Sequence, residues 1–198
     1  TRILLHGKRQ EAEAGISSNL DKHLLTSCAA RSPHLHESSV EGAFRLLYDL
    51  GFKTDIIDGE QVRSGDISRY QLLYYPFPYY MDGTLAARLE AWVQNGGVLI
   101  AEAFFGSYND DTGLHNTVIP GFGFDDVFGV REDRSMCSGE FRGAYQDTDG
   151  AIGSVRSTVE IALENGDHIA GFNYYEELVP SHCEILGRFT TAPLTDAA

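Results

Sequence analysis

The sequence predicts an α/β protein with a doubly wound, mostly parallel sheet and extra antiparallel strands in its second half. Through the first half, apolar runs of strand length alternate with segments in which apolar residues recur at helical period. That alternation is typical of parallel strands joined by helices that cover both faces of the sheet. In the second half, glycines separate short apolar runs, which favours short antiparallel strands at the sheet edge or in a small sheet of their own.

Four runs in the first half are predicted strands. The first is "RILLH" (2–6), and a polar, irregular stretch follows it as far as "RSPHLHESS". "KTDIID" (53–58), "RYQLLYYP" (69–76) and "VLIAEA" (98–103) supply the others, the third strand ending at a proline that cannot continue a ladder. In the second half we expect a short helix at "FDDVFG" and strands in "GEFRGAYQ", "STVEIAL", "HIAGFNYY" and "CEILGRF".

Two segments of the first half are predicted helices. "HESSVEGAFRLLYDLGF" (36–52) has apolar residues near helical period and a C-terminal stop at Gly51. "MDGTLAARLEAWVQNGG" (81–97) begins at a candidate capping residue, Asp82, and finishes at a glycine pair. Its apolar face consists of Leu85, Leu89, Trp92 and Val93.

Composition limits the classes of partner. The chain has 198 residues, a formal net charge of -14 and a pI near 4.7, so nucleic acid and anionic lipid surfaces would be repelled. No stretch approaches the roughly 20 apolar residues of a membrane span. Small neutral ligands and protein surfaces remain as partners. We expect one domain over residues 1–198, with an α/β core at 1–132 and mainly short strands at 133–198.

Three cysteines without CxxC spacing, Cys28, Cys137 and Cys183, indicate reduced thiols in a cytoplasmic protein. The first residue is Thr1, and the chain opens in a predicted strand. We therefore expect a piece of a longer polypeptide.

A site in such a sheet is expected at the carboxyl ends of the strands, near the point where strand order reverses. His6 and Glu102 follow the first and fourth predicted strands, and either could act as an acid or base. The alternatives are a hydrogen-bonded histidine at a strand end and a carboxylate that caps a loop or pairs with an arginine. Aromatic candidates for a ligand or interface are Tyr79, Tyr80, Phe105 and Tyr108, unless some of these rings point into the core.

Other chemistries lack their motifs. "PGFGF" has neither GxGxxG nor GxxxxGK spacing, and no GxSxG elbow occurs in the chain. His34 and His36 form an "HLH" pair, but a zinc site needs further ligands. We therefore expect no cofactor and no metal.

A run of motifs in order resembles the beta-galactosidase trimerisation domain of family-42 glycoside hydrolases. The resemblance rests on the helix ending in "DLGF", the "YQLLYYP" strand, the "LAARLEAWVQNGGVLI" join, "GLHNTVIPGFGFDDVFGVRE" and "YYEELVPSHCEILGRF", and it covers about residues 36 to 190. It implies a flavodoxin-like, class I glutamine-amidotransferase-like fold. It also implies a homo-oligomer, with a trimer suspected, and a separate preceding barrel domain that carries the catalytic carboxylates.

One departure from the amidotransferases bears on function. They place a cysteine at the turn after the strand that "VLIAEA" matches, whereas Glu102-Ala103-Phe104 stands here, which argues against glutamine hydrolysis by that mechanism. The leading hypothesis is a non-catalytic oligomerisation domain of a glycoside hydrolase, with a further role in lining a neighbouring subunit's active site. Two alternatives stay open: a stand-alone hydrolase that uses Glu102 and His6, and a carbohydrate-binding module.

Overall fold

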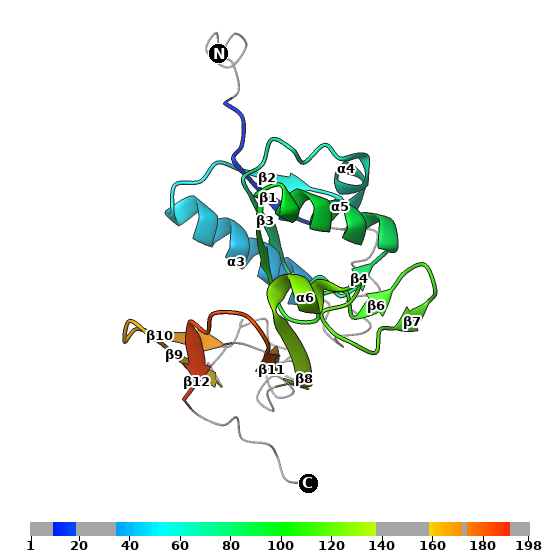
Figure 1. Ribbon diagram of the computed structural model, residues 1–198. Helices are drawn as coiled ribbons and strands as arrows, with labels where there is room; N and C mark the ends of the chain where they lie inside the picture. The colour runs from blue at the N-terminus through cyan, green and yellow to red at the C-terminus, as the bar shows by residue number, and fades with distance from the viewer. Residues whose placement is uncertain (1–9, 19–34, 138–158, 172–173, 191–198) are drawn as a thin grey trace, which may run out of the picture. The chain divides into compact units, whose positions relative to one another are not determined.

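The computed structural model describes residues 10–18, 35–137, 159–171 and 174–190 (Figure 1). The chain divides into two compact units, Thr1–Thr117 and Val118–Ala198. The first is an α/β unit with a parallel sheet, and the second contains antiparallel strands and one short helix. This architecture confirms the predicted α/β class.

The first unit is centred on a four-stranded parallel sheet. Its order is β2-β1-β3-β5, with β1 (Ala14–Ser17), β2 (Thr54–Ile57), β3 (Leu72–Tyr75) and β5 (Val98–Ala101). Chain order therefore reverses between β1 and β3, which makes the carboxyl ends of these two strands the expected ligand position.

Helices connect the parallel strands and lie on both sides of the sheet. Figure 1 shows α3 (Leu35–Asp49) on one side, and α4 (Gly59–Ser64) and α5 (Gly83–Gln94) on the other. Ala43 and Leu47 of α3 form a buried cluster with Ala14 and Ile16 of β1. Because strand side chains alternate, Leu73 and Tyr75 of β3 face the opposite side. Both helices of the sequence prediction are thus confirmed.

Strand β1 is the main difference from the prediction. It lies in the stretch that the sequence predicts to be irregular, and "RILLH" lies outside the described residues. The sequence "AGIS" has no run of β-branched residues, yet all four are buried because β1 runs between two neighbours. A Cβ at Gly15 would lie 2.8 Å from Leu73 Cδ2, so a side chain at this position would crowd the centre of the sheet.

The join between α5 and β5 forms as predicted. Asp82 caps the helix by accepting a hydrogen bond from the Leu85 amide at 2.8 Å. After the helix, Gly96 has a φ of 95°, and a Cβ at Gly97 would lie 2.4 Å from carbons of the Trp92 indole. The second glycine is therefore needed because the indole occupies the space of a side chain.

A second, three-stranded sheet stands beyond the strand ends of the first unit. Its order is β4-β6-β7, with β4 (Tyr80–Met81) parallel to β6 (Tyr108–Asn109), and β6 antiparallel to β7 (Leu114–His115). The sequence did not predict it. This small sheet brings together two loops that follow β3 and β5.

The second unit contains the predicted antiparallel strands. Here β9 (Val159–Leu163) lies between β10 (His168–Gly171) and β12 (Gly187–Phe189), while β8 (Val130–Cys137) pairs with β11 (Tyr174–Pro180). Among the described residues these strands form sheets of their own. The short helix α6 (Phe124–Phe128) confirms the prediction from "FDDVFG", β8 was not predicted, and "GEFRGAYQ" lies outside the described residues. No helix in the described part of the chain is long and apolar enough to cross a membrane.

Candidate functional site

Glu102, at the exit of β5, binds three groups of its own unit. Its Oε2 accepts hydrogen bonds from Ser39 Oγ at 2.8 Å and from the Phe77 amide at 3.2 Å, and its Oε1 accepts one from Tyr74 Oη at 3.2 Å. These donors come from α3, from β3 and from the turn after β3. The carboxylate therefore links three elements, and none of these three described partners is an arginine. His6, the other expected partner, lies outside the described residues.

Burial raises the pKa of the Glu102 carboxyl above its ordinary value. The hydrogen bonds from Ser39, Tyr74 and the Phe77 amide oppose that rise because they stabilise the charged form, but burial has the larger effect. A raised pKa suits a general acid. A raised pKa is also expected of a buried carboxylate whose only role is to stabilise a turn through hydrogen bonds.

The turn after β5 places a phenylalanine in the left-handed backbone region. Phe104 has a φ of 66°, a conformation that costs a non-glycine residue about 1 kcal/mol or more. Its side chain is buried and meets Phe77, itself at a φ of 40°, edge to face at 5.3 Å between ring centroids. The turn at the exit of β5 therefore carries a buried apolar side chain at its left-handed position.

Six rings beyond the strand ends form a continuous aromatic cluster. Tyr80 and Tyr108 lie 4.9 Å apart because β4 pairs with β6 at this position, and Tyr79 packs on Tyr80 at 5.0 Å and on His115 at 5.8 Å. The aromatic cluster is made of Phe77, Tyr79, Tyr80, Phe104, Tyr108 and His115.

The aromatic cluster unites three of the four aromatic residues expected at the site. Tyr79, Tyr80 and Tyr108 are all half-buried, which leaves part of each ring accessible. Phe105 is 1% exposed and packs against Tyr75, so it belongs to the core. His115 could not be predicted as a member of the cluster, because its place depends on the β6–β7 pairing.

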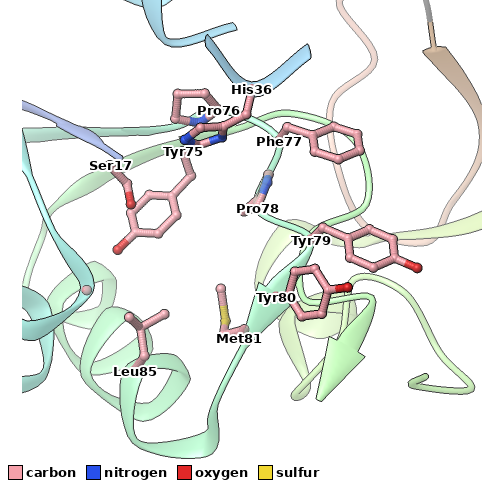
Figure 2. Close-up of a pocket in the computed structure, with 11 residues that line it drawn as sticks. Ser17, His36, Tyr75, Pro76, Phe77, Pro78, Tyr79, Tyr80, Met81 and Leu85 are labelled. Carbon is pink, nitrogen blue, oxygen red and sulfur yellow. The ribbon is translucent and has the colours of Figure 1, made fainter. Parts of the chain in front are cut away.

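A pocket opens at the switch point of the sheet (Figure 2). It is small, with a cavity volume of about 30 Å³, which is room for about one water molecule. The lining comes from the ends of β1 and β3, from the starts of α3, α4 and α5, and from the loop after β3: Ser17, His36, Gly59, Tyr75, Pro76, Phe77, Pro78, Tyr79, Tyr80, Met81 and Leu85. Ser17 and Tyr75 were missed as site residues because β1 was not predicted and the side of β3 was not assigned.

Tyr75 carries a buried hydroxyl group in this pocket. Its Oη has no hydrogen-bond partner in the described part of the chain, and burial raises the pKa of the phenol. Ser17 is near enough to lower that pKa, but the two hydroxyls do not meet the geometry of a hydrogen bond. Among the described residues, no group of three or more His, Cys, Asp or Glu side chains could hold a metal ion.

The structure defines a doubly wound α/β domain whose strand-end rim carries aromatic rings and a buried, hydrogen-bonded carboxylate. The family model for the beta-galactosidase trimerisation domain matches residues 10–193, and the chain belongs to that family. This confirms the resemblance found in the sequence.

Solved structures share the fold. The beta-galactosidase from Bacillus circulans sp. alkalophilus superposes with a TM-score of 0.75 at 18% identity, over 96% of this chain and 26% of that one. The polyextremophilic beta-galactosidase from the Antarctic haloarchaeon Halorubrum lacusprofundi gives a TM-score of 0.71 at 17% identity, over 93% and 25% of the two chains. The beta-galactosidase from Bifidobacterium adolescentis gives 0.53 at 17% identity, over 92% and 79%.

The chain spans about a quarter of the length of the first two of these enzymes. No curated protein matches the sequence.

Proposed function

We propose that this chain is a non-catalytic domain that assembles a glycoside hydrolase of the beta-galactosidase type into a trimer. The observation that carries the proposal is the family match over residues 10–193, which spans both compact units and so supports one domain over the whole chain. The galactosidases from Bacillus circulans sp. alkalophilus and Halorubrum lacusprofundi are about four times as long, which leaves room for a barrel that holds two catalytic carboxylates.

The rim of the parallel sheet supports a non-catalytic role. Glu102 is engaged by three donors from its own unit, and the left-handed turn residue Phe104 presents no nucleophile. The alternative of a stand-alone hydrolase therefore has weaker support than assembly. The free thiol of Cys183 is consistent with the cytoplasmic location that we propose.

Helix α3 offers an apolar surface for a second copy of the chain. Phe44 and Tyr48 stack at 6.2 Å on its outer side and are 43% and 69% exposed, while Leu46 and Leu50 are 49% and 64% exposed. Each copy carries a net charge of -14, so association must overcome repulsion between like charges. Apolar and aromatic anchors, which are typical of interface cores, meet that requirement.

The aromatic cluster suits a second role in the assembly. We propose that Tyr79, Tyr80 and Tyr108 line a neighbouring subunit's active site, where their flat faces and hydroxyls would contact the carbohydrate substrate. Support comes from their partial exposure and their position beyond the strand ends. This role needs no chemistry from the chain itself.

The test is the mass of the chain in solution, measured by light scattering at micromolar concentrations. We expect the mass of three copies for the unaltered chain and a lower mass for the double variant Phe44→Ser, Tyr48→Ser. The matched control, Glu41→Ser with Arg45→Ser, removes another exposed pair at the same spacing on the same helix and should leave the mass unchanged.

A monomer from the unaltered chain would count against assembly by this domain. If the variant Phe44→Ser, Tyr48→Ser still forms a trimer, the interface between copies does not depend on these side chains of α3.

A further inference from the structure

Phe44 and Tyr48 of α3 can supply only half of each contact in a ring of three copies. Across a two-fold axis a surface meets its own equivalent, but around a three-fold axis it meets a different surface of the next copy. The two stacked rings, here called the aromatic surface, are one such surface under the proposed function. Each copy must therefore carry a second surface that fits the first.

Strand β5 presents exposed apolar side chains at the edge of the parallel sheet. Among the described strands it pairs with β3 alone, and Val98 and Ile100 are 55% and 36% exposed. Their neighbours in the register, Leu72 and Tyr74, pack against the buried cluster of α3 and β1. Val98 and Ile100 therefore face the same side of the sheet as α3.

The sequence of β5 lacks the features that usually protect an edge strand. Exposed edges tend to carry a charged residue, a proline or a bulge, because a regular apolar edge invites association with another chain. Residues Val98–Ala101 read "VLIA", and their register with β3 is continuous. The strand therefore adds no charge to the repulsion between copies that each carry a net charge of -14.

Helix α3 separates this strand edge from the aromatic surface. Ser39 lies on the side of α3 that faces β5, because its hydroxyl donates to Glu102 at the exit of that strand. At about 100° per residue, Leu46 lies within about 20° of Ser39 around the helix, whereas Phe44 and Tyr48 lie about 140° and 180° away. Leu46, which is 49% exposed, is therefore on the β5 side, and the aromatic surface is on the opposite side.

Leu46 also lies at the level of the exposed residues of β5. Helix α3 connects the parallel strands β1 and β2, so it runs back from their carboxyl ends toward their starts. Leu46 is about 10 Å beyond Ser39 in that direction. Val98 and Ile100 are about 13 and 7 Å before Glu102 on β5. Leu46, Val98 and Ile100 thus form one apolar region, here called the β5 surface.

We propose that the β5 surface of one copy binds the aromatic surface of the next, so that three head-to-tail contacts close the ring. Two aromatic rings against branched aliphatic side chains are typical of the apolar core of an interface. The inference rests on the proposed assembly into a trimer and assigns the partner surface that such a ring requires.

The test is a mixing experiment with two complementary variants, measured by light scattering. Val98→Thr with Ile100→Thr removes the apolar strand edge but keeps residues that favour a strand, and Phe44→Ser with Tyr48→Ser removes the aromatic surface. Each variant alone should have the mass of one copy. An equimolar mixture should approach the mass of two copies, because each mixed pair retains one intact contact. The mixture is measured up to the millimolar range, since a single contact is weaker than a closed ring.

Two further variants serve as support and control. Leu46→Ser changes the β5 surface from the helix and leaves the strand intact, so it should lower the mass without altering β5. Leu114→Thr is the matched control: it removes a 67% exposed apolar side chain from another strand, β7, and should keep the mass of three copies. Urea unfolding followed by Trp92 fluorescence checks that each variant is folded.

Two results would overturn this inference alone. One is a mixture of the two monomeric variants that stays at the mass of one copy. The other is a Val98→Thr, Ile100→Thr variant that keeps the mass of three copies; a lower stability of that trimer would indicate that β5 is covered within its own chain. A monomer from the unaltered chain is a different outcome, because it overturns the proposed function and this inference with it.

Discussion

Replacing Glu102 separates a structural carboxylate from a catalytic one. Glu102→Ala removes the acceptor of three hydrogen bonds, from Ser39, Tyr74 and the Phe77 amide. At about 1.5 kcal/mol for each bond to a charged acceptor, the loss for the three bonds is about 4.5 kcal/mol, and relief of the buried charge and access of water to Ser39 reduce it. We expect the free energy of unfolding to fall by about 2 to 4 kcal/mol.

Glu102→Gln tests the charge alone. Its amide oxygen can accept from Ser39 and the Phe77 amide, and its NH₂ can donate to Tyr74, so the expected change at neutral pH is within about 1 kcal/mol. Because burial raises the pKa of Glu102 in the folded state, the folded chain holds this proton more tightly than the unfolded chain. The contribution of this proton to the free energy of unfolding is fully present below the pKa that Glu102 has in the unfolded chain. It is lost as pH rises through the pKa of Glu102 in the folded chain. The Gln variant should lack this decline.

Urea unfolding between about pH 4 and pH 8 measures both effects. The single tryptophan, Trp92, is 9% exposed on α5 and reports on the first unit, which contains Glu102. An unchanged stability in Glu102→Ala would contradict the three-bond linkage. Loss of a hydrolytic activity in Glu102→Gln, with stability preserved, would restore the carboxylate as a catalyst.

Three further predictions concern local packing, charge and backbone strain. Gly97→Ala should destabilise the chain by about 1 to 3 kcal/mol because its Cβ overlaps Trp92, whereas Gly42→Ala, on an exposed helical position with open space, should stabilise it by about 0.5 to 1 kcal/mol in the same urea assay. Asp82→Asn should cost about 1 to 2 kcal/mol. Burial raises the pKa of Asp82, but its hydrogen bonds outweigh burial and lower the pKa overall. The ionised carboxylate therefore contributes to the free energy of unfolding above its unfolded-state pKa, and this contribution is lost on acidification. The Asn variant should lose less stability than the unaltered chain when the pH is lowered. Phe104→Gly should be more stable than Phe104→Ala by about 1 kcal/mol, the reverse of the usual order, and equal stabilities would refute strain at that turn.

Local signals account for the elements that the sequence predicted correctly. The cap at Asp82, the helical period of α5 and the glycine pair after it all act within a few residues. Strand β1 has no such signal, because "AGIS" becomes a strand through its neighbours on both sides. A side chain at Gly15 would meet crowding that only the assembled sheet creates.

The difference between local signals and contacts made only in the folded sheet also explains which features of the site could be predicted. Parallel topology correctly placed Glu102 at a strand end, but its partner Ser39 is 63 residues away along the chain and could not be read from the sequence. Phe105 was expected at the rim because it follows a strand. The left-handed Phe104 before it changes the direction of the chain, and Phe105 turns into the core.

The turn after β5 connects the fold to its proposed role. The residue at a turn after a parallel strand stands at the rim of the sheet, where ligands of open α/β sheets usually bind. In this chain that residue is Phe104, and its ring packs with Phe77 and Tyr79 and supports the aromatic cluster. The backbone strain at Phe104 is therefore offset by aromatic packing, and the turn fixes the base of the aromatic cluster.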